Sequence, residues 1–232
     1  MKPEVIVAID VPEAAAAVDL VGKLPSDAWI KIGLELFARE GPAIVSRFVE
    51  EGRDVFLDLK LHDIPNTVAG AIRNVAALGA RLLTVHASGG ESMLRAAAQA
   101  ASQAGDGTLK LLAVTVLTSL DDAEMGAIMG PGAKVEAAVG RLAGLARESG
   151  IDGVISSVAE CRAVKLSCGE QFLVATPGIR LATVGADDQK RVATPSVAAQ
   201  AGADFIVVGR AISGADDPAE AIRKVRAALV AA

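Results

Sequence analysis

Two kinds of segment alternate along the chain: short apolar runs rich in β-branched residues, and longer stretches rich in alanine and leucine. The short runs are typical of buried strands and the longer stretches are typical of helices. The short runs predict eight strands, at residues 5–10, 29–33, 55–60, 82–87, 111–117, 153–157, 172–177 and 205–210.

The stretches between the strands predict helices at about 13–23, 35–51, 66–78, 90–104, 134–149, 158–167 and 194–201, with a final helix at about 217–231. Several of these stretches are followed by a glycine, which is the residue that most easily adopts the left-handed conformation that ends a helix. The glycines in this position are Gly79, Gly105, Gly150 and Gly202.

The predicted strands are almost continuously apolar, which indicates a parallel sheet covered by helices. About eight strand–helix units in 232 residues predict an α/β fold, a closed (β/α)₈ TIM barrel whose single domain spans residues 1–232. A doubly wound open sheet is the alternative. No linker, low-complexity tract or block of like charge indicates a second domain.

The composition supplies ample material for a core, with 52% hydrophobic residues and a mean hydropathy of +0.42. No apolar run reaches the roughly 18 residues of a membrane span, and Asp10 ends the N-terminal apolar stretch too early for a signal peptide. We therefore expect a cytoplasmic protein. A net charge of −5, 3% aromatic residues and the lack of tyrosine argue against a nucleic-acid partner.

Cysteine and histidine are too few to predict a metal site. Cys161 and Cys168 have neither the spacing of zinc ligands nor that of a C-x-x-C redox pair, so we expect reduced thiols on or near a helix. The two histidines are His62 and His86. We expect His86 to lie at the end of a strand with a local hydrogen bond.

The densest group of ionisable residues lies in D-L-K-L-H-D-I-P-N-T-V at 58–68. Residues two apart in a strand share a face, so Asp58 and Lys60 should point the same way and the leucines around them the other way. An acid and a base where a core strand meets its loop cost stability unless they are paired. Taken alone, they fit either a solvated strand end with a satisfied ion pair or a catalytic site.

Polar and ionisable residues also stand at the ends of other predicted strands. Barrel enzymes build their active sites at the carboxyl ends of the strands, so these residues favour the catalytic interpretation. They are Asp10, Lys31, Thr118, Ser119 and the segments at 176–180 and 207–210.

The last two strand–helix units predict a phosphate site. Gly209 and Arg210 open a turn after the last strand, where a glycine N–H and an arginine fork can both bind phosphate oxygens. The longest polar loop that follows a strand is at 178–194, and it carries Arg180 and Gln189. A loop of this kind is a candidate lid.

Six segments resemble the orotidine 5′-phosphate decarboxylase family. The most specific is the eleven-residue motif at 58–68, and the segments follow one another at family-like intervals from residue 8 to residue 210. The other five are A-I-D at 8–10, K-I-G at 31–33, V-L-T-S at 116–119, T-P-G-I-R at 176–180 and V-G-R at 208–210.

The resemblance implies a homodimer of barrels that converts orotidine 5′-monophosphate to uridine 5′-monophosphate and CO₂. This is the last step of de novo pyrimidine nucleotide synthesis, and the resemblance implies that it uses no metal or organic cofactor.

The resemblance also implies a role for each matching residue. Lys60 would protonate C6 of the pyrimidine, within a network of alternating charges formed by Lys31, Asp58, Lys60 and, from the other subunit, Asp63. Asp10 and Lys31 would address the ribose hydroxyls, together with Thr67 across the interface. Thr118 would lie near the pyrimidine ring, and the phosphate would be held by Arg180, Gln189, Gly209 and Arg210.

Two alternatives remain at this stage. Related decarboxylases of keto-sugar phosphates resemble the D-x-K-x-x-D pattern but use Mg²⁺ with a glutamate of the second strand, where this chain has Lys31, a residue that would repel a divalent cation. A metal-dependent decarboxylase or epimerase of that kind is one alternative. The other is a non-catalytic nucleotide-binding barrel, which would have no use for Asp58, Lys60 and Asp63 together.

Overall fold

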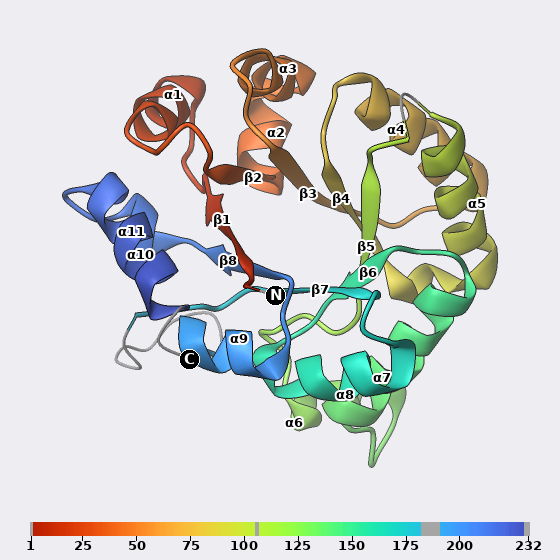
Figure 1. The fold of residues 1–232 in the computed structure, drawn as a ribbon. Helices are drawn as coiled ribbons and strands as arrows, with labels where there is room; N and C mark the ends of the chain where they lie inside the picture. Colours follow the sequence, from red (N-terminus) through yellow and green to blue (C-terminus); the bar gives the residue numbers. More distant parts are fainter. Residues whose placement is uncertain (1, 105–106, 182–190, 230–232) are drawn as a thin grey trace.

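Eight parallel strands close into a barrel in the computed structural model, which describes residues 2–104, 107–181 and 191–229 (Figure 1). The strands follow one another around the barrel in chain order, and β1 pairs with β8 to close it. They are β1 (Glu4–Ala8), β2 (Trp29–Gly33), β3 (Val55–Leu61), β4 (Leu82–His86), β5 (Lys110–Val114), β6 (Gly153–Ile155), β7 (Leu173–Thr176) and β8 (Phe205–Val208). The predicted (β/α)₈ barrel is confirmed.

Helices form the outer layer around the barrel (Figure 1). A short 3₁₀ turn, η1 (Ala87–Gly89), follows β4. The helices are α1 (Ala14–Gly22), α2 (Leu34–Glu40), α3 (Pro42–Glu50), α4 (Pro65–Ala77), α5 (Gly90–Gln103), α6 (Asp122–Met129), α7 (Val135–Glu148), α8 (Val158–Cys168), α9 (Pro195–Ala201), α10 (Arg210–Ser213) and α11 (Pro218–Ala228). Among the described residues, none of these helices has the length and apolar character needed to cross a membrane.

Several strands are shorter at their carboxyl ends than the apolar runs predict. β5 ends at Val114 and not at residue 117, because its neighbour β6 ends at Ile155 and the last paired residues are Val114 and Ile155. Likewise, β1 ends at Ala8, so Asp10 lies in the loop after the strand. Asp10 after β1 and Val116, Leu117 and Thr118 after β5 line a cavity at this end of the barrel.

The helix predicted at 35–51 is two helices. Gly41 has φ +66°, which is outside the helical region, and Pro42 lacks the N–H that would continue the first helix. Helix α6 was not predicted, and the turn predicted after Arg210 is the short helix α10. Three of the four predicted helix-ending glycines have positive φ, at 79, 150 and 202, whereas Gly105 lies outside the described residues.

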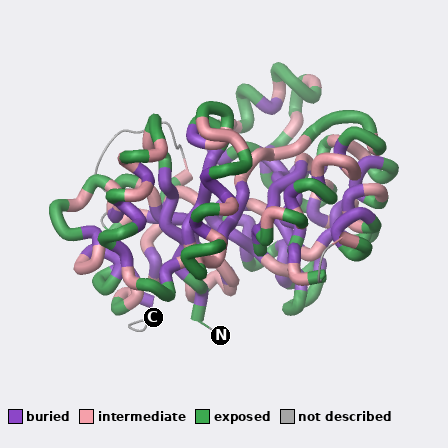
Figure 2. The backbone as a smooth tube through the Cα atoms, turned by 90° about the horizontal axis from the view of Figure 1, so that it is seen from above, coloured by how far each residue is buried: buried purple, intermediate pink, exposed green. Residues whose placement is uncertain are grey.

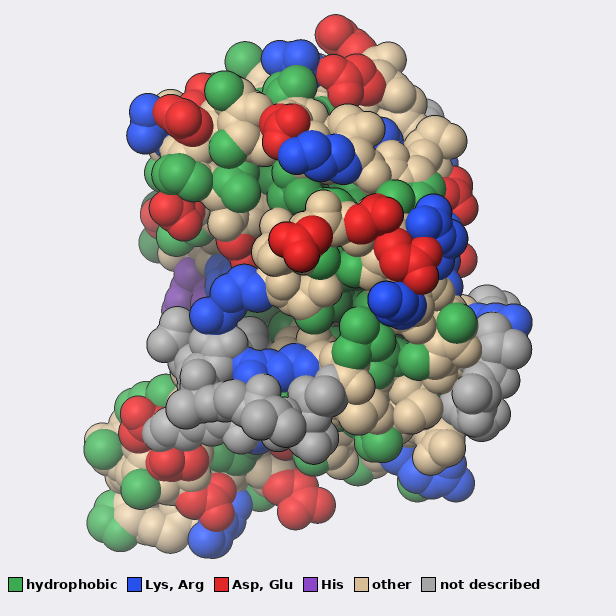
Figure 3. All heavy atoms as spheres, turned by 90° about the vertical axis from the view of Figure 1, so that its left-hand side faces the viewer, with side chains coloured by type: hydrophobic (Ala, Val, Ile, Leu, Met, Phe, Trp, Pro, Cys, Tyr) green, Lys and Arg blue, Asp and Glu red, His purple; other side chains and the backbone are tan. Residues whose placement is uncertain are grey.

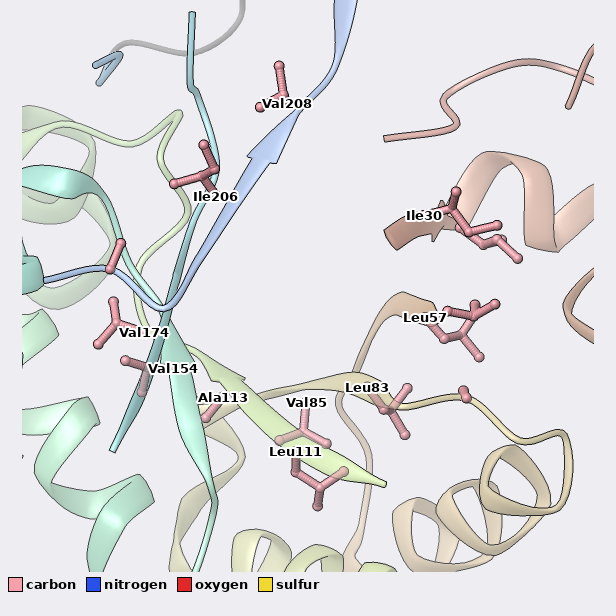
Figure 4. Close-up of a cluster of buried hydrophobic side chains, with 14 of the residues drawn as sticks. Ile30, Leu57, Leu83, Val85, Leu111, Ala113, Val154, Val174, Ile206 and Val208 are labelled. Carbon is pink, nitrogen blue, oxygen red and sulfur yellow. The ribbon is translucent and has the colours of Figure 1, made fainter. Parts of the chain in front are cut away.

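The core has two layers. Residues that point outward from the strands pack against the helices, and Figure 4 shows such side chains from β2 to β8, including Ile30, Leu57, Leu83 and Val174. Residues at alternate positions fill the barrel itself: Ile6, Ala8, Phe56, Leu82, Leu112, Ala175 and Val207. The backbone trace in Figure 2 accordingly has buried residues through the middle of the molecule and exposed ones along the outer helices.

The amino end of the barrel is closed by large side chains. Trp29 and Phe205 begin β2 and β8, and their ring centroids lie 5.6 Å apart. Phe56 is buried inside the barrel, two residues before Asp58 on the same strand. The interior is therefore apolar from its base up to the level at which charged residues begin, near the carboxyl ends of the strands.

Candidate active site

A cavity of about 1010 Å³ opens at the carboxyl ends of the strands. Its apolar wall includes Val114, Ile155 and Val207, which continue the barrel interior. Eight of the residues to which the resemblance gives a role also line it: Asp10, Lys31, Asp58, Lys60, Thr118, Arg180, Gly209 and Arg210. The fold thus gathers at one place residues that are separated by up to 200 positions in the chain.

Four of these residues form a row of alternating charges. The Asp10 carboxylate accepts from the Lys31 ammonium at 2.9 Å, and Lys31 Nζ lies 3.9 Å from Asp58 Oδ2. The same Asp58 oxygen accepts from Lys60 Nζ at 2.8 Å. Lys31 is buried and Asp58 nearly so, whereas 37% of the Lys60 side chain is exposed toward the cavity. Each charge therefore has a neighbour of opposite sign, and Lys60 is the more exposed of the two lysines in the row.

The glycine of K-I-G makes room for the first ion pair in this row. A Cβ atom on Gly33 would lie 3.0 Å from Lys31 Nζ and 3.1 Å from Asp10 Oδ1. Gly33 pairs with Asp58 in the ladder between β2 and β3, so the same position also faces the strand that carries the central acid. A side chain here would crowd the ion pair between Lys31 and Asp10.

The sequence analysis correctly predicts that Asp58 and Lys60 lie side by side, but it assumes a regular strand. The strand is irregular: the register between β3 and β4 shifts between Leu57 and Leu61, and Lys60 has φ +52°. Among the described residues, Lys60 is the only non-glycine residue with positive φ. Simple alternation along a regular strand does not describe this segment.

Thr84 of β4 is a site residue that the sequence analysis missed. Its hydroxyl donates to Asp58 Oδ1 at 2.9 Å and accepts from the Lys60 backbone N–H at 2.8 Å. Thr84 is fully buried. The available signal was a single polar residue among the apolar residues of β4 that precede His86.

The two histidines lie together beside this row. Their ring centroids are 5.3 Å apart, and His86 is half-buried at the end of β4, the strand-end position expected from the sequence. Burial lowers the pKa of His86 below 6.5, and the positive charges of His62 and Lys60 lower it further, against an opposing effect of Asp58. Across residues 2–104, 107–181 and 191–229, no group of three or more His, Cys, Asp or Glu residues is arranged to hold a metal ion.

The cysteines lie where the sequence places them, on helix α8. Both Cys161 and Cys168 are buried free thiols. Burial raises the pKa of Cys161 to about 12, so its thiol stays protonated and unreactive at neutral pH.

Arginines border the cavity on the side of β7 and β8. Arg180 follows β7, and Arg210 begins α10 directly after Gly209. The two ends of the long loop are tied together, since Arg180 N donates to the Ala193 carbonyl at 2.9 Å and Ala193 N donates to the Gly178 carbonyl at 3.2 Å. Gln189 lies outside the described residues.

Arg191, two positions after Gln189 in the chain, is a second residue that sequence reasoning missed. Its guanidinium forms an ion pair with Glu160 near the start of α8 and donates to the Leu117 carbonyl at 3.1 Å. Leu117 lines the cavity and precedes Thr118. Arg191 thus connects the end of the long loop to the wall of the cavity formed after β5.

Asp63 and Thr67 lie outside this cavity. Both are exposed, and Asp63 Oδ1 accepts from the backbone N–H of Ile64 at 2.6 Å. Ile64 between them is 66% exposed, an unusual position for a large apolar side chain. Within one chain, the cavity therefore lacks both residues.

This arrangement suits an anionic ligand that has an apolar planar part. Arginines at one end can bind a phosphate, and the apolar wall can accept a ring. The row of ion pairs is partly buried, and electrostatic effects are strong in such a setting. The face shown in Figure 3 carries interspersed acidic and basic side chains over the outer helices. This mixture of charges differs from the basic stripe that is typical of nucleic-acid-binding proteins.

Several proteins of similar sequence and a solved structure of similar fold carry the same activity name. The model of the orotidine 5′-phosphate decarboxylase / HUMPS family matches residues 3–225. The orotidine 5′-phosphate decarboxylase of Anaeromyxobacter dehalogenans is 51% identical over 99% of this chain and 100% of the relative, and that of Moorella thermoacetica is 46% identical over 98% and 92%. The crystal structure of orotidine 5′-phosphate decarboxylase from Lactobacillus acidophilus superposes with a TM-score of 0.88 at 37% identity, covering 99% of both chains.

Proposed function

The chain belongs to the orotidine 5′-phosphate decarboxylase / HUMPS family, and from this premise we propose how its residues decarboxylate orotidine 5′-monophosphate. The enzyme is a carboxy-lyase that forms uridine 5′-monophosphate and CO₂ in pyrimidine nucleotide synthesis. One observation carries the assignment of residues: the row of Asp10, Lys31, Asp58 and Lys60 faces the cavity at the carboxyl ends of the strands.

Lys60 is the proposed proton donor. Loss of CO₂ from C6 leaves an electron pair in the plane of the ring, where the π system cannot delocalise it. A fixed cation beside C6 stabilises this charge, and an ammonium can then deliver a proton to the same carbon. Lysine suits both tasks, because arginine holds its protons too tightly to give one up.

Asp58 is the proposed partner that holds Lys60 in place. Its carboxylate accepts from Lys60 Nζ at 2.8 Å and balances the ammonium charge, and Lys31 lies on its other side. The row leaves Lys60 as the cation most open to the cavity. In this proposal, Asp58 also lies near the carboxylate that the substrate loses.

The other parts of the substrate are assigned to the rest of the cavity. Asp10 and Lys31 bind the ribose hydroxyls, and Thr118 lies by the pyrimidine ring. The phosphate is remote from C6, but its binding energy can organise the charged groups around the reacting carbon. The proposed phosphate ligands are Arg180, Gln189, Gly209 and Arg210.

We further propose a homodimer in which Asp63 and Thr67 complete the cavity of the partner subunit. The support is that both are exposed and outside the cavity of their own chain, and that exposed Ile64 lies between them. An apolar side chain in that position is typical of a surface that another chain covers. Asp63 would then be the second carboxylate beside Lys60.

A spectrophotometric assay of decarboxylation tests the role of Lys60. In Lys60→Ala, turnover should fall by more than about 10³-fold, because both the cation and the proton donor are lost. Inhibition by uridine 5′-monophosphate should be largely unchanged, since the phosphate and ribose contacts remain. Near-normal turnover of this variant would remove Lys60 from its assigned role.

Two controls complete this assay. Lys110→Ala removes an exposed lysine paired with Asp152 at the opposite end of the barrel, and it should leave turnover unchanged. A chelator should also leave turnover unchanged. Loss of activity with chelator would instead favour the metal-dependent chemistry of keto-sugar-phosphate decarboxylases.

A further inference from the structure

We propose that Thr84 is a positioning residue, which sets the geometry of the proton donor and its carboxylate through a single hydroxyl group. The inference deepens the roles proposed for Lys60 and Asp58 and rests on them. Thr84 itself is fully buried and does not line the cavity, so it acts on the reaction through these two neighbours.

Both hydrogen-bonding functions of the hydroxyl are used. Its proton is donated to Asp58 Oδ1, at 2.9 Å, and its oxygen accepts from the Lys60 backbone N–H, at 2.8 Å. A hydroxyl has one proton to donate, so the donation to Asp58 leaves the oxygen lone pairs to receive the Lys60 N–H. The two contacts therefore support each other, and neither can be rearranged without loss of the other.

The contact with Lys60 supports an uncommon backbone conformation. Residues with a side chain rarely adopt φ +52°, and the ladder between β3 and β4 shifts register across this position. The N–H of Lys60 donates to a side chain of the next strand, the Thr84 hydroxyl. Thr84 thus fixes the point from which the lysine side chain enters the cavity.

The contact with Asp58 determines which carboxylate oxygen is available. Oδ1 is occupied by the Thr84 hydroxyl, and Oδ2 is left to accept from Lys60 Nζ at 2.8 Å, with Lys31 Nζ at 3.9 Å. A carboxylate held at one oxygen cannot rotate freely about its terminal bond. Thr84 therefore fixes both ends of the contact between Asp58 and Lys60.

The variant Thr84→Val tests this proposal, because valine has nearly the same shape but lacks the hydroxyl. We expect kcat to fall about 10- to 100-fold, the loss that corresponds to a hydrogen bond to a charged group. The KM for orotidine 5′-monophosphate and inhibition by uridine 5′-monophosphate should change little, since the proposed phosphate and ribose contacts remain. Thr84→Ser restores the hydroxyl and should recover most of the lost kcat.

Thr115→Val is the matched control. Thr115 is also a buried threonine near the carboxyl end of a strand, and its hydroxyl donates to the Ile155 carbonyl at 2.9 Å, away from the charged row. It should lose thermal stability to a similar degree but keep its kcat. Equal losses of kcat in Thr84→Val and Thr115→Val would overturn the proposal, and so would a Thr84→Ser variant as impaired as Thr84→Val.

Amide hydrogen exchange gives a readout that does not depend on turnover. In Thr84→Val the Lys60 amide loses its acceptor and should exchange faster than in the wild type, while Thr84→Ser should stay close to the wild type. If Thr84→Val does not fold, the same comparison is made between Thr84→Ser and the wild type, and a faster Lys60 amide in the serine variant overturns the proposal. Absence of wild-type decarboxylation would contradict the proposed function alone, since the exchange measurement would still test Thr84.

Discussion

Lys60 combines an unfavourable backbone conformation with an ion-paired side chain. A non-glycine residue at φ +52° carries a cost of roughly 1–3 kcal/mol, which persists only where its surroundings determine the conformation. Here the surroundings are the Thr84 hydroxyl at the backbone and the Asp58 carboxylate at the ammonium. Backbone strain of this kind is concentrated at active sites, so it favours a functional role for Lys60.

His86 predicts a dependence of stability on pH. Its pKa is lowered in the folded state, first by burial, so the unfolded chain binds the proton more strongly. The free energy of unfolding should therefore fall as the pH decreases from about 7.5 to about 5.5, through the ordinary pKa of 6.5. Urea denaturation at several pH values measures this, and His86→Gln should show a weaker dependence than the wild type.

His62→Gln is the control for this measurement. The charge of His62 is only the second cause of the lowered pKa of His86, after burial. Its removal should consequently reduce the pH dependence less than the removal of His86 does. An unchanged pH dependence in His86→Gln would show that other groups are responsible.

At the scale of elements, local pattern predicts most of the fold. Eight apolar runs give eight strands, and their nearly continuous apolar character indicates a parallel sheet because both faces are covered. Helix α6 could also have been predicted: Asp121 accepts from the N–H groups of Ala123 and Glu124, and Glu124 accepts from the Asp121 N–H, a capping box readable in the sequence. Boundaries were less predictable, since strand ends depend on the length of the neighbouring strand.

Contacts between elements could not be predicted from local pattern. Thr84 lies 26 positions from Asp58, and Arg191 lies 74 positions from Leu117, so no periodicity relates them. The charged residues of the site were found because each interrupts an apolar run near the end of a strand. In a barrel enzyme, the active site is built at the carboxyl ends of the strands. Buried threonine and a loop arginine carry no comparable signal.

Arg191 predicts a large loss of stability when its charge is removed. It forms an ion pair with Glu160, whose side chain is only 8% exposed, and ties α8 to the segment after β5. Arg191→Met leaves a buried carboxylate without its cation, which should lower the free energy of unfolding by roughly 3–5 kcal/mol. Urea denaturation provides the measurement.

An exposed ion pair serves as the comparison. Arg223 pairs with Glu220 on α11, and both side chains are well exposed. Arg223→Met should lose less than about 1 kcal/mol, because solvent screens a surface pair. Similar losses in the two variants would contradict the assigned role of Arg191, whereas partial recovery in Arg191→Met with Glu160→Gln would support it.

At the scale of the whole molecule, closure of the barrel brings the ends of all eight strands to one rim. Residues from Asp10 to Arg210 reach a common cavity, while the closed end is filled by apolar side chains. Two proposed site residues, Asp63 and Thr67, remain outside this cavity in a single chain. In the proposed homodimer, association of two chains would bring them to the Lys60 ammonium of the partner subunit.

Mixing of inactive subunits tests whether Asp63 acts in the partner's site. In a hybrid dimer of Lys60→Ala and Asp63→Ala subunits, the subunit with intact Lys60 faces an intact Asp63 from its partner, so one of the two sites is of wild-type composition. Random exchange makes about half of the dimers hybrid, so about one quarter of the wild-type activity should return. Decarboxylation is measured after exchange has been confirmed by native mass spectrometry.

Lys60→Ala mixed with Asp58→Ala is the matched control for subunit mixing. Asp58 and Lys60 contact each other within one chain, at 2.8 Å, so each hybrid site then lacks one of the two and no activity should return. Recovery in the first mixture and not in the second would assign Asp63 to the partner's site and Asp58 to its own. If neither mixture recovers although hybrids are present, the shared site is contradicted, and the exposed position of Asp63 must have another cause.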